Sequence, residues 1–275
     1  MGFLQIDENR CKKDGLCIQD CPMNIIYFQN GDGYPVIAPA DENMCSRCGH
    51  CVVVCPHGAL VHAKVPMDSC PPVRKVLNIN EEQAAQFLRS RRSIRLYKEQ
   101  QVETEKITKL IEIARYAPSG GNSQSVEWLV IKDKSAIGRI AGMTANWIRQ
   151  ALKENPQLAV ATAYLPAIVR AWDKGIDSIL RNAPVVVVAS APGRTTNGMV
   201  DLNLALSYLE LYAPLLGLGT CWAGLLQRAL LSSPSLKRQV GIPEDHPYHY
   251  PMMLGYPKVK YYRLPARKPP KITFK

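Results

Sequence analysis

A cysteine pattern that occurs twice near the start of the chain most strongly constrains its fold. The second copy has the spacing C-x2-C-x2-C-x3-C followed by proline, and its members are Cys45, Cys48, Cys51 and Cys55. Moved back by 34 residues, the same grid ends again before a proline and falls on Cys11, Asp14, Cys17 and Cys21. Only Asp14 departs from the pattern. This internal repeat predicts two similar halves in one small domain.

The spacing suits an iron–sulfur cube, which needs one thiolate for each iron. Residues 1–64 resemble the bacterial two-cluster ferredoxins, in which the fourth cysteine of each run ligates the other cluster. The resemblance implies two clusters of the [4Fe-4S] type. It assigns one cluster to Cys21, Cys45, Cys48 and Cys51. It assigns the other cluster to Cys11, Cys17, Cys55 and, as a candidate, Asp14.

Two other uses of the cysteines are disfavoured. Paired C-x2-C runs can bind zinc, but zinc does not need three cysteines in seven residues plus a fourth before proline, twice over. A disulfide framework is disfavoured because the chain has nine cysteines, an odd number, and residues 1–10 lack the basic and apolar regions of a secretory signal. We therefore expect a cytoplasmic protein.

Asp14 leaves the state of its cluster open. A carboxylate is a harder ligand than a thiolate, so Asp14 could hold the fourth iron weakly, or the iron could be lost to give a [3Fe-4S] cluster. Alternatively, Asp14 is a solvated loop residue. The nearby His50, His57 and His62 are also expected to be solvated loop residues, because the cysteines already fill the ligand positions.

Proline and hydrophobic periodicity divide the rest of the chain. Residues 65–81 hold several prolines and predict a linker without regular structure. Residues 82–275 then mix predicted helices with apolar strands such as 126–131, 185–189 and 252–256. Residues 199–218 predict an apolar helix kinked at Pro214. Because regular βαβ alternation is missing, we expect an α+β fold.

Four segments of residues 82–275 together resemble the nitroreductase family of FMN enzymes. They begin at the run RRSIR of residues 91–95 and the loop APSGGNSQ of residues 117–124. They continue with GLGTCWAG at 217–224 and with LGYP at 254–257 followed by Arg267 and Lys268. Each segment alone is a weak signal, but their order is specific. The resemblance implies a nitroreductase-like α+β domain with FMN at the interface of a homodimer.

The chemistry of FMN fits these residue types. Its phosphate favours guanidinium groups, which form bidentate contacts. The residues that the resemblance assigns to FMN are Arg91, Arg92, Ser93, Arg95, Ser119, Asn122, Gln124, Gly224, Arg267 and Lys268. Gly224 would offer a backbone N–H near the flavin N5. The acidic residue that the family has beside this glycine is often replaced, and Ala223 stands there in this chain, which leaves tuning by a carboxylate open.

Charge and hydropathy bear on the partners. Residues 1–64 carry 5 Lys+Arg and 7 Asp+Glu, whereas residues 65–275 carry 29 and 16, so the net charge changes from −2 to +13. The basic tail could suggest a nucleic-acid partner, but no DNA- or RNA-binding motif accompanies it. The longest apolar stretches fall short of the roughly 18 residues that span a membrane. We expect neither a nucleic-acid partner nor a membrane span.

The combination predicts a flavin-dependent oxidoreductase in which electrons pass between iron–sulfur clusters and FMN. The expected acceptor is a flat, electron-poor small molecule, such as a nitroaromatic or a quinone, and the donor is NAD(P)H or a reduced ferredoxin-like protein. Trp147, Tyr164 and Trp172 are candidates to line the acceptor pocket, although core packing is more common for such side chains. Two alternatives are an electron-transfer module serving a partner enzyme and an oxidative member of the same fold.

Overall fold

A computed structural model describes residues 2–275. The chain divides into two compact units, which we describe separately. Unit 1 holds the residues before Asn80 together with Gly121–Ser123, and unit 2 holds Asn80–Gly120 and Gln124–Lys275. In the part of the chain that the structure describes, no helix is both long and apolar enough to cross a membrane.

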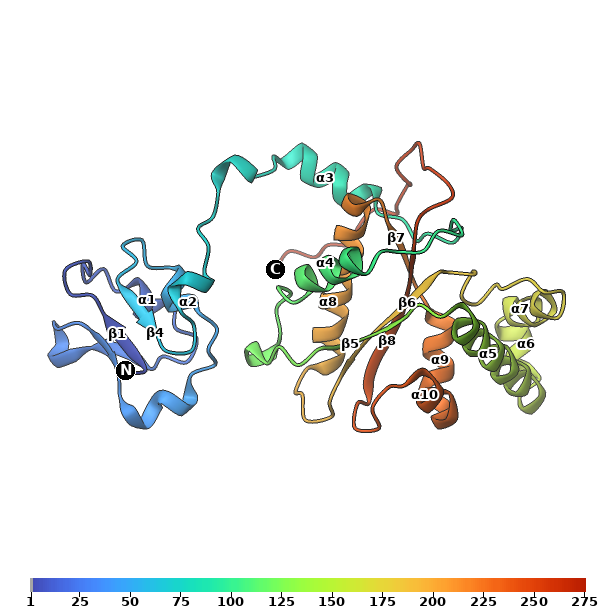
Figure 1. The fold of residues 1–275 in the computed structure, drawn as a ribbon, viewed down its shortest axis with the longest axis horizontal. Helices are drawn as coiled ribbons and strands as arrows, with labels where there is room; N and C mark the ends of the chain where they lie inside the picture. The colour runs from blue at the N-terminus through green and yellow to red at the C-terminus, as the bar shows by residue number, and fades with distance from the viewer. Residues whose placement is uncertain (1) are drawn as a thin grey trace. The chain divides into compact units, whose positions relative to one another are not determined.

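Unit 1 is built from very short elements. Strand β1 (Leu4–Ile6) pairs antiparallel with β4 (Leu60–His62), and β2 (Ile26–Phe28) pairs antiparallel with β3 (Pro35–Ile37). Two four-residue helices, α1 (Leu16–Gln19) and α2 (His50–Val53), follow the cysteine loops. Figure 1 labels α1, α2, β1 and β4 of this unit.

The backbone of unit 1 repeats with the same 34-residue offset as the cysteines. Helices α1 and α2 and strands β2 and β4 occupy equivalent positions. Residues in the left-handed region also recur in pairs: Lys13 with Arg47, Gly15 with Gly49, and Asn24 with Gly58. Because few residue types adopt this conformation readily, the shared turns show that both cysteine loops fold in the same way.

Unit 2 is built around a four-stranded antiparallel sheet with strand order β5-β6-β8-β7. Its strands are β5 (Glu127–Ile131), β6 (Val185–Ala191), β7 (Gly219–Trp222) and β8 (Tyr248–Gly255). All seven residues of β6 are buried. A central strand covered on both faces needs apolar side chains in both directions, which explains its run of valines.

Helices cover both faces of this sheet (Figure 1). On one face, α4 (Thr104–Ala114) and α8 (Gly198–Tyr212) pack on Val185 and Val187 of β6. The opposite face is covered by α5 (Lys134–Glu154), α9 (Gly224–Ser232) and α10 (Pro234–Val240). The remaining helices of the unit are α3 (Glu81–Ser90), α6 (Gln157–Ala161) and α7 (Tyr164–Asp173).

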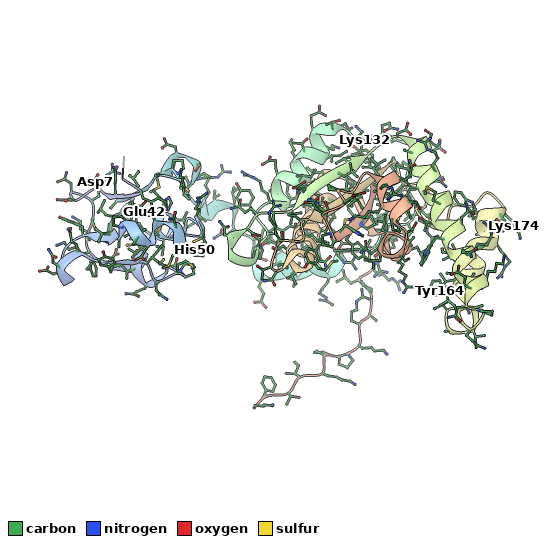
Figure 2. The ribbon with its side chains drawn as sticks, turned by 90° about the horizontal axis from the view of Figure 1, so that it is seen from below. Asp7, Glu42, His50, Lys132, Tyr164 and Lys174 are labelled. Carbon is green, nitrogen blue, oxygen red and sulfur yellow. The ribbon has the colours of Figure 1, made fainter. Side chains whose placement is uncertain are left out.

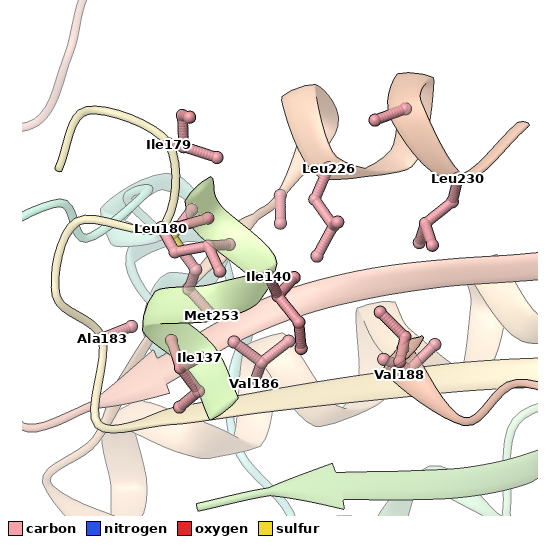
Figure 3. Packing of buried hydrophobic residues seen from close by; sticks show 14 of the residues in the cluster. Ile137, Ile140, Ile179, Leu180, Ala183, Val186, Val188, Leu226, Leu230 and Met253 are labelled. Atoms are coloured by element: carbon pink, nitrogen blue, oxygen red, sulfur yellow. The ribbon is translucent and has the colours of Figure 1, made fainter. Parts of the chain in front are cut away.

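The second of these faces has a closely packed core. Figure 3 shows Ile137 and Ile140 of α5 beside Val186 and Val188 of β6, with Leu226 of α9 next to them. Each of these side chains is at most 3 % exposed. Fully burying one aliphatic side chain stabilises a fold by about 1.5–3 kcal/mol. This core fixes the position of α9 relative to the sheet.

One expectation for unit 2 is wrong, and one long helix was not predicted. The apolar segment 199–218 is not one kinked helix: α8 ends at Tyr212, and a 3-10 turn, Ala213–Leu216, follows with Pro214 in its first turn. Proline is compatible with a helix start, where no N–H is needed. Helix α5, the longest element of the chain, was also not predicted, although the α+β class itself is confirmed.

Candidate functional site

The seven cysteines of the two runs lie around two separate cavities. One is lined by Cys11, Asp14, Cys17 and Cys55. The other is lined by Cys21, Cys45, Cys48 and Cys51. The last cysteine of each run therefore lies with the first three positions of the other run. This exchange agrees with the ligand sets that the sequence resemblance implies.

The donors fit a cluster better than a single ion. Across residues 2–275, no three His, Cys, Asp or Glu side chains converge closely enough to hold one metal ion. A cube of four irons and four sulfides spreads its ligands around a larger body, and each iron takes one thiolate. No disulfide forms among the described residues, so all the thiols are available.

Burial raises the pKa of one thiol in each cavity, Cys51 and Cys17. Burial and the nearby Cys48 and Cys45 raise the pKa of Cys51 to about 12. Burial likewise raises the pKa of Cys17, and Cys55 and Cys11 add to the effect. Several buried thiolates in one place are unfavourable without a cation. The two cavities are therefore suited to positively charged iron, which stabilises the thiolate form of the cysteines.

The cavity with Asp14 has a distinctive corner. Asp14 Oδ1 accepts a hydrogen bond from the Leu16 N–H at 3.2 Å, and Asp14 Oδ2 lies 3.4 Å from His57 Nε2. The carboxylate thus already has two local partners. It lines the cavity from an exposed position, and His57 is exposed as well. Asp14 is placed where it could contact an iron, and its role stays a prediction.

The expectation that all three histidines are solvated is wrong for His62. His50 and His57 are exposed, and Figure 2 labels His50 at the surface of unit 1. His62, in contrast, is only 2 % exposed and lines the cavity of Cys45. It is the last residue of β4, and its neighbour Val61 is exposed. Strand alternation turns His62 inward, a signal that the sequence already contained.

In unit 2, the basic segment 91–95 lies along strand β7. The Ile94 N–H donates to the Thr220 carbonyl at 2.8 Å. This close approach requires Gly219, because a Cβ built there would lie 2.3 Å from Ile94 Cγ1. The sequence therefore places Ser93 and Arg95 next to the segment that ends at Gly224. Two of the segments recognised in the sequence meet here.

A cavity of about 390 Å³ opens where they meet. It is lined by Arg95 and Gly224, two of the predicted FMN residues, and by Cys221, Trp222 and Ala223. Arg181, Arg228 and Tyr164 complete its polar wall, and none of the residues that line it, all of them described, carries a carboxylate. Three guanidinium groups without a local acid favour an anionic or electron-rich ligand.

Arg91 and Arg92 line a neighbouring cavity of about 220 Å³ in unit 2. Arg91 Nη1 donates to Glu210 Oε1 at 2.9 Å, and Trp222 Nε1 donates to Glu210 Oε2 at 2.9 Å. Glu210 is 7 % exposed, so these two bonds satisfy a buried carboxylate. Arg91 keeps further N–H groups for another ligand, because a guanidinium has five.

The other predicted FMN residues do not line either of these cavities. Ser119 Oγ accepts the Gln124 N–H at 3.0 Å within the loop, and Asn122 and Gln124 have φ angles of 55° and 47°. Arg267 and Lys268 are exposed and lie in a tail without helix or strand. Within one chain, the structure therefore assembles only part of the predicted site.

The three candidate aromatic residues have different positions. Trp147 and Trp172 are partly buried and pack against the core beside α5. Tyr164, labelled in Figure 2, begins α7, and its hydroxyl accepts a hydrogen bond from Arg228 Nη1 at 2.6 Å. Only Tyr164 lines the cavity that contains Gly224. Arg181 and Arg228 were not predicted, since isolated arginines outside a motif give no signal in one sequence.

Comparison with known proteins agrees with both halves of this description. The sequence pattern of the nitroreductase family matches residues 88–256, more than half of the chain. The chain belongs to the nitroreductase family. Residues 9–60 match the 4Fe-4S dicluster domain, so the protein joins an N-terminal ferredoxin domain to a nitroreductase domain. This architecture is that of a flavin-dependent oxidoreductase with iron–sulfur clusters.

Individual relatives resemble the nitroreductase domain. An Archaeoglobus fulgidus protein, named as a candidate NADH dehydrogenase/NAD(P)H nitroreductase, is 27 % identical over 182 residues, which cover 64 % of this chain and 87 % of that protein. A nitroreductase with bound FMN from Bacteroides fragilis has a TM-score of 0.57 at 20 % identity, over 71 % of this chain and 99 % of its own. An FMN-bound nitroreductase from Desulfitobacterium hafniense has a TM-score of 0.55 at 20 % identity. The match covers 72 % of this chain and 99 % of that one.

A buried histidine gives the nitroreductase domain a testable pH dependence. His249 Nδ1 lies 3.2 Å from Gln227 Oε1, and burial, aided by Lys237, lowers the pKa of His249 to about 4. The buried neutral His249 contributes fully to stability above the pKa that it has in the unfolded chain, near 6.5. This contribution is lost as the pH falls toward 4. We expect the unfolding free energy to fall by up to about 3 kcal/mol over this range.

The variant His249→Asn retains a side-chain N–H but does not titrate, so its unfolding free energy should change less over this range. Urea unfolding followed by tryptophan fluorescence measures this, because all four tryptophans lie in residues 82–275. If the unfolding free energies of the variant and the parent changed equally with pH, His249 would not be the source of this pH dependence.

Proposed function

We propose that this protein is an FMN-dependent reductase in which electrons pass between two iron–sulfur clusters and the flavin. The supporting observation is the cavity beside Gly224, which combines arginine side chains with the start of α9 and contains no carboxylate. When bound, FMN accepts a hydride or single electrons and passes them on. The ferredoxin domain on the same chain would exchange electrons with it one at a time.

The residues would divide the binding of FMN between them. Arg95 would donate hydrogen bonds inside the cavity, and Gly224 would present its backbone N–H at the N-terminus of α9, where no side chain blocks approach. Arg91, Arg92 and Ser93 would hold the phosphate and ribityl end. Arg91 is already oriented by Glu210, which limits the side-chain entropy lost on binding.

A homodimer would complete the site. Ser119, Asn122, Gln124, Arg267 and Lys268 line neither cavity of the single chain. We infer that these residues act in a dimer, in which the loop and the tail reach a flavin at the subunit interface. We also infer a cytoplasmic location, because thiols that serve as ligands persist where the environment is reducing.

In the ferredoxin domain, we assign one cluster to Cys21, Cys45, Cys48 and Cys51 as a [4Fe-4S] cluster. We assign the other to Cys11, Cys17 and Cys55 with Asp14 at the fourth corner, as a [4Fe-4S] cluster that loses one iron easily to become [3Fe-4S]. The support is the grouping of these side chains around two cavities.

The test is an anaerobic absorption titration of the reconstituted protein with NADH, NADPH and reduced ferredoxin, each followed by a nitroaromatic or quinone acceptor. Bleaching of flavin and clusters, then reoxidation by the acceptor, supports the proposed reductase and identifies its donor. Reduction without turnover of any small acceptor would instead indicate an electron-transfer module. Failure to bind FMN would refute the proposal.

Arg95 gives a specific prediction for flavin binding. Arg95→Gln keeps a polar side chain but removes the charge and most N–H donors, so we expect the Kd for FMN to rise about 10- to 100-fold. Quenching of FMN fluorescence measures the Kd. The control Arg139→Gln changes an exposed arginine of α5 that does not line the cavity, and its Kd should equal that of the parent.

A further inference from the structure

The buried histidine of the ferredoxin domain distinguishes the two cluster sites. We propose that His62 donates a hydrogen bond from Nε2 to Cys45 Sγ and thereby makes the cluster held by Cys45 easier to reduce than the other. This inference rests on the ferredoxin domain and on the ligand sets assigned above. It does not depend on the flavin reaction, so either can fail without the other.

The hydrogen bonds of the imidazole identify its tautomer. The Lys64 backbone N–H donates to His62 Nδ1 at 3.0 Å, so Nδ1 is an acceptor without a proton. In the neutral ring the proton is then on Nε2, which lies 3.5 Å from Cys45 Sγ. The only group Nε2 can offer to the sulfur is therefore an N–H.

The fold holds the ring in this position. His62 pairs with Leu4 across the β1–β4 ladder, and the Phe3 ring packs edge-on against the imidazole with a centroid separation of 4.7 Å. The side chain is 2 % exposed, so water does not compete for its N–H. The Arg47 backbone N–H, 3.4 Å away, is a second donor to the same sulfur. Cys45 is thus a sulfur with two fixed donors.

The internal repeat shows that this arrangement is not shared by the other site. The residue 34 positions before His62 is Phe28, the last residue of β2, and a phenyl ring has no N–H to donate. At the other cavity the nearby histidine is His57, which faces Asp14 and not a cysteine sulfur. The two halves share their backbone but differ in this hydrogen bond.

A donor to a ligand sulfur affects the two redox states unequally. Reduction adds negative charge to the cluster and its sulfurs, so the N–H group stabilises the reduced state more than the oxidised state. Hydrogen bonds to the sulfurs are among the factors that set cluster potentials. The electron should therefore reside on the Cys45 cluster before it occupies the other one.

The test compares His62→Phe with the parent as full-length, anaerobically reconstituted proteins. Each is titrated with reductant and followed by EPR. The variant Asp14→Cys alters only the ligand set that contains Cys11, Cys17 and Cys55, so it identifies which signal belongs to which cluster. The comparison is made at the potential where the Cys45 cluster of the parent is half reduced. At this potential we expect the ratio of reduced to oxidised Cys45 cluster to be roughly tenfold lower in His62→Phe. For one electron this corresponds to a midpoint potential lower by ~59 mV. The other cluster should keep its midpoint potential.

Two further variants separate hydrogen bonding from packing. His62→Gln retains an N–H donor and should recover most of the potential lost in His62→Phe. His50→Phe makes the same change at an exposed histidine of the same cavity wall and should leave both potentials unchanged. An unchanged potential in His62→Phe, an equal shift of both clusters, or equal losses in the Phe and Gln variants would overturn the proposal. If His62→Phe assembles no cluster, His62→Leu replaces it in the comparison.

Discussion

Removal of the clusters is expected to unfold the ferredoxin domain while the nitroreductase domain stays folded. The buried apolar residues of unit 1 are few, and its strands have three residues each; these buried residues are Cys17, Ile25, Ile26, Val52, Ala59 and Leu60. So little buried surface does not offset the conformational entropy of about 79 residues. The free energy of binding a structural metal group is therefore also folding free energy for this domain.

Hydrogen exchange of the full-length protein before and after chelation under oxidising conditions measures this directly. Amides of β1 to β4 should exchange at close to unfolded rates once the iron is lost, while those of β6 and α8 keep their protection. Cys51→Ala should lose the cluster of its cavity and most of the domain's protection. Cys70→Ala is the matched control, because Cys70 lines neither cavity. A cluster-free protein with protected β1–β4 amides would contradict this account.

The sequence predicted the ferredoxin domain well because its constraints are local. An offset of 34 residues, visible in the cysteines alone, also relates the helices, two strands and the left-handed turns. Ligand spacing of this kind depends on a few neighbouring residues. The burial of His62 was missed because the alternation of β4 was not applied to a residue type that is often exposed.

The nitroreductase domain was less predictable where long-range packing decides the structure. Segments 91–95 and 217–224 were found as motifs, but their meeting at Gly219 depends on the path of β7 beside β8. Arg181 and Arg228 enter the cavity from a loop and from α9, and no local pattern marks them. Helix α5 was missed because half of the residues on its buried face are alanine or threonine, which weakens the hydrophobic signal; that face consists of Ile137, Ile140, Ala141, Thr144, Ala145 and Ile148.

Replacement of Glu210 by leucine is expected to destabilise the nitroreductase domain. Glu210 accepts hydrogen bonds from Arg91 Nη1 and Trp222 Nε1 in a place where water has little access. Glu210→Leu leaves the Trp222 N–H and the partly exposed Arg91 guanidinium without their acceptor, which costs about 1–3 kcal/mol. For a domain of this size the melting temperature should fall by roughly 2–12 °C. Calorimetry of the full-length protein measures the change.

Two comparisons test whether the buried pair causes this loss. The double variant Glu210→Leu with Arg91→Leu removes both charges, so it should recover part of the stability that Glu210→Leu loses. Asp173→Leu breaks the exposed pair with Arg149 and should cost at most about 1 kcal/mol. Because Arg91 is assigned to the FMN phosphate, Glu210→Gln should also weaken FMN binding through the loss of its orientation, with a smaller effect on melting. Equal melting temperatures for Glu210→Leu and Asp173→Leu would show that the network of Arg91, Glu210 and Trp222 does not stabilise the domain.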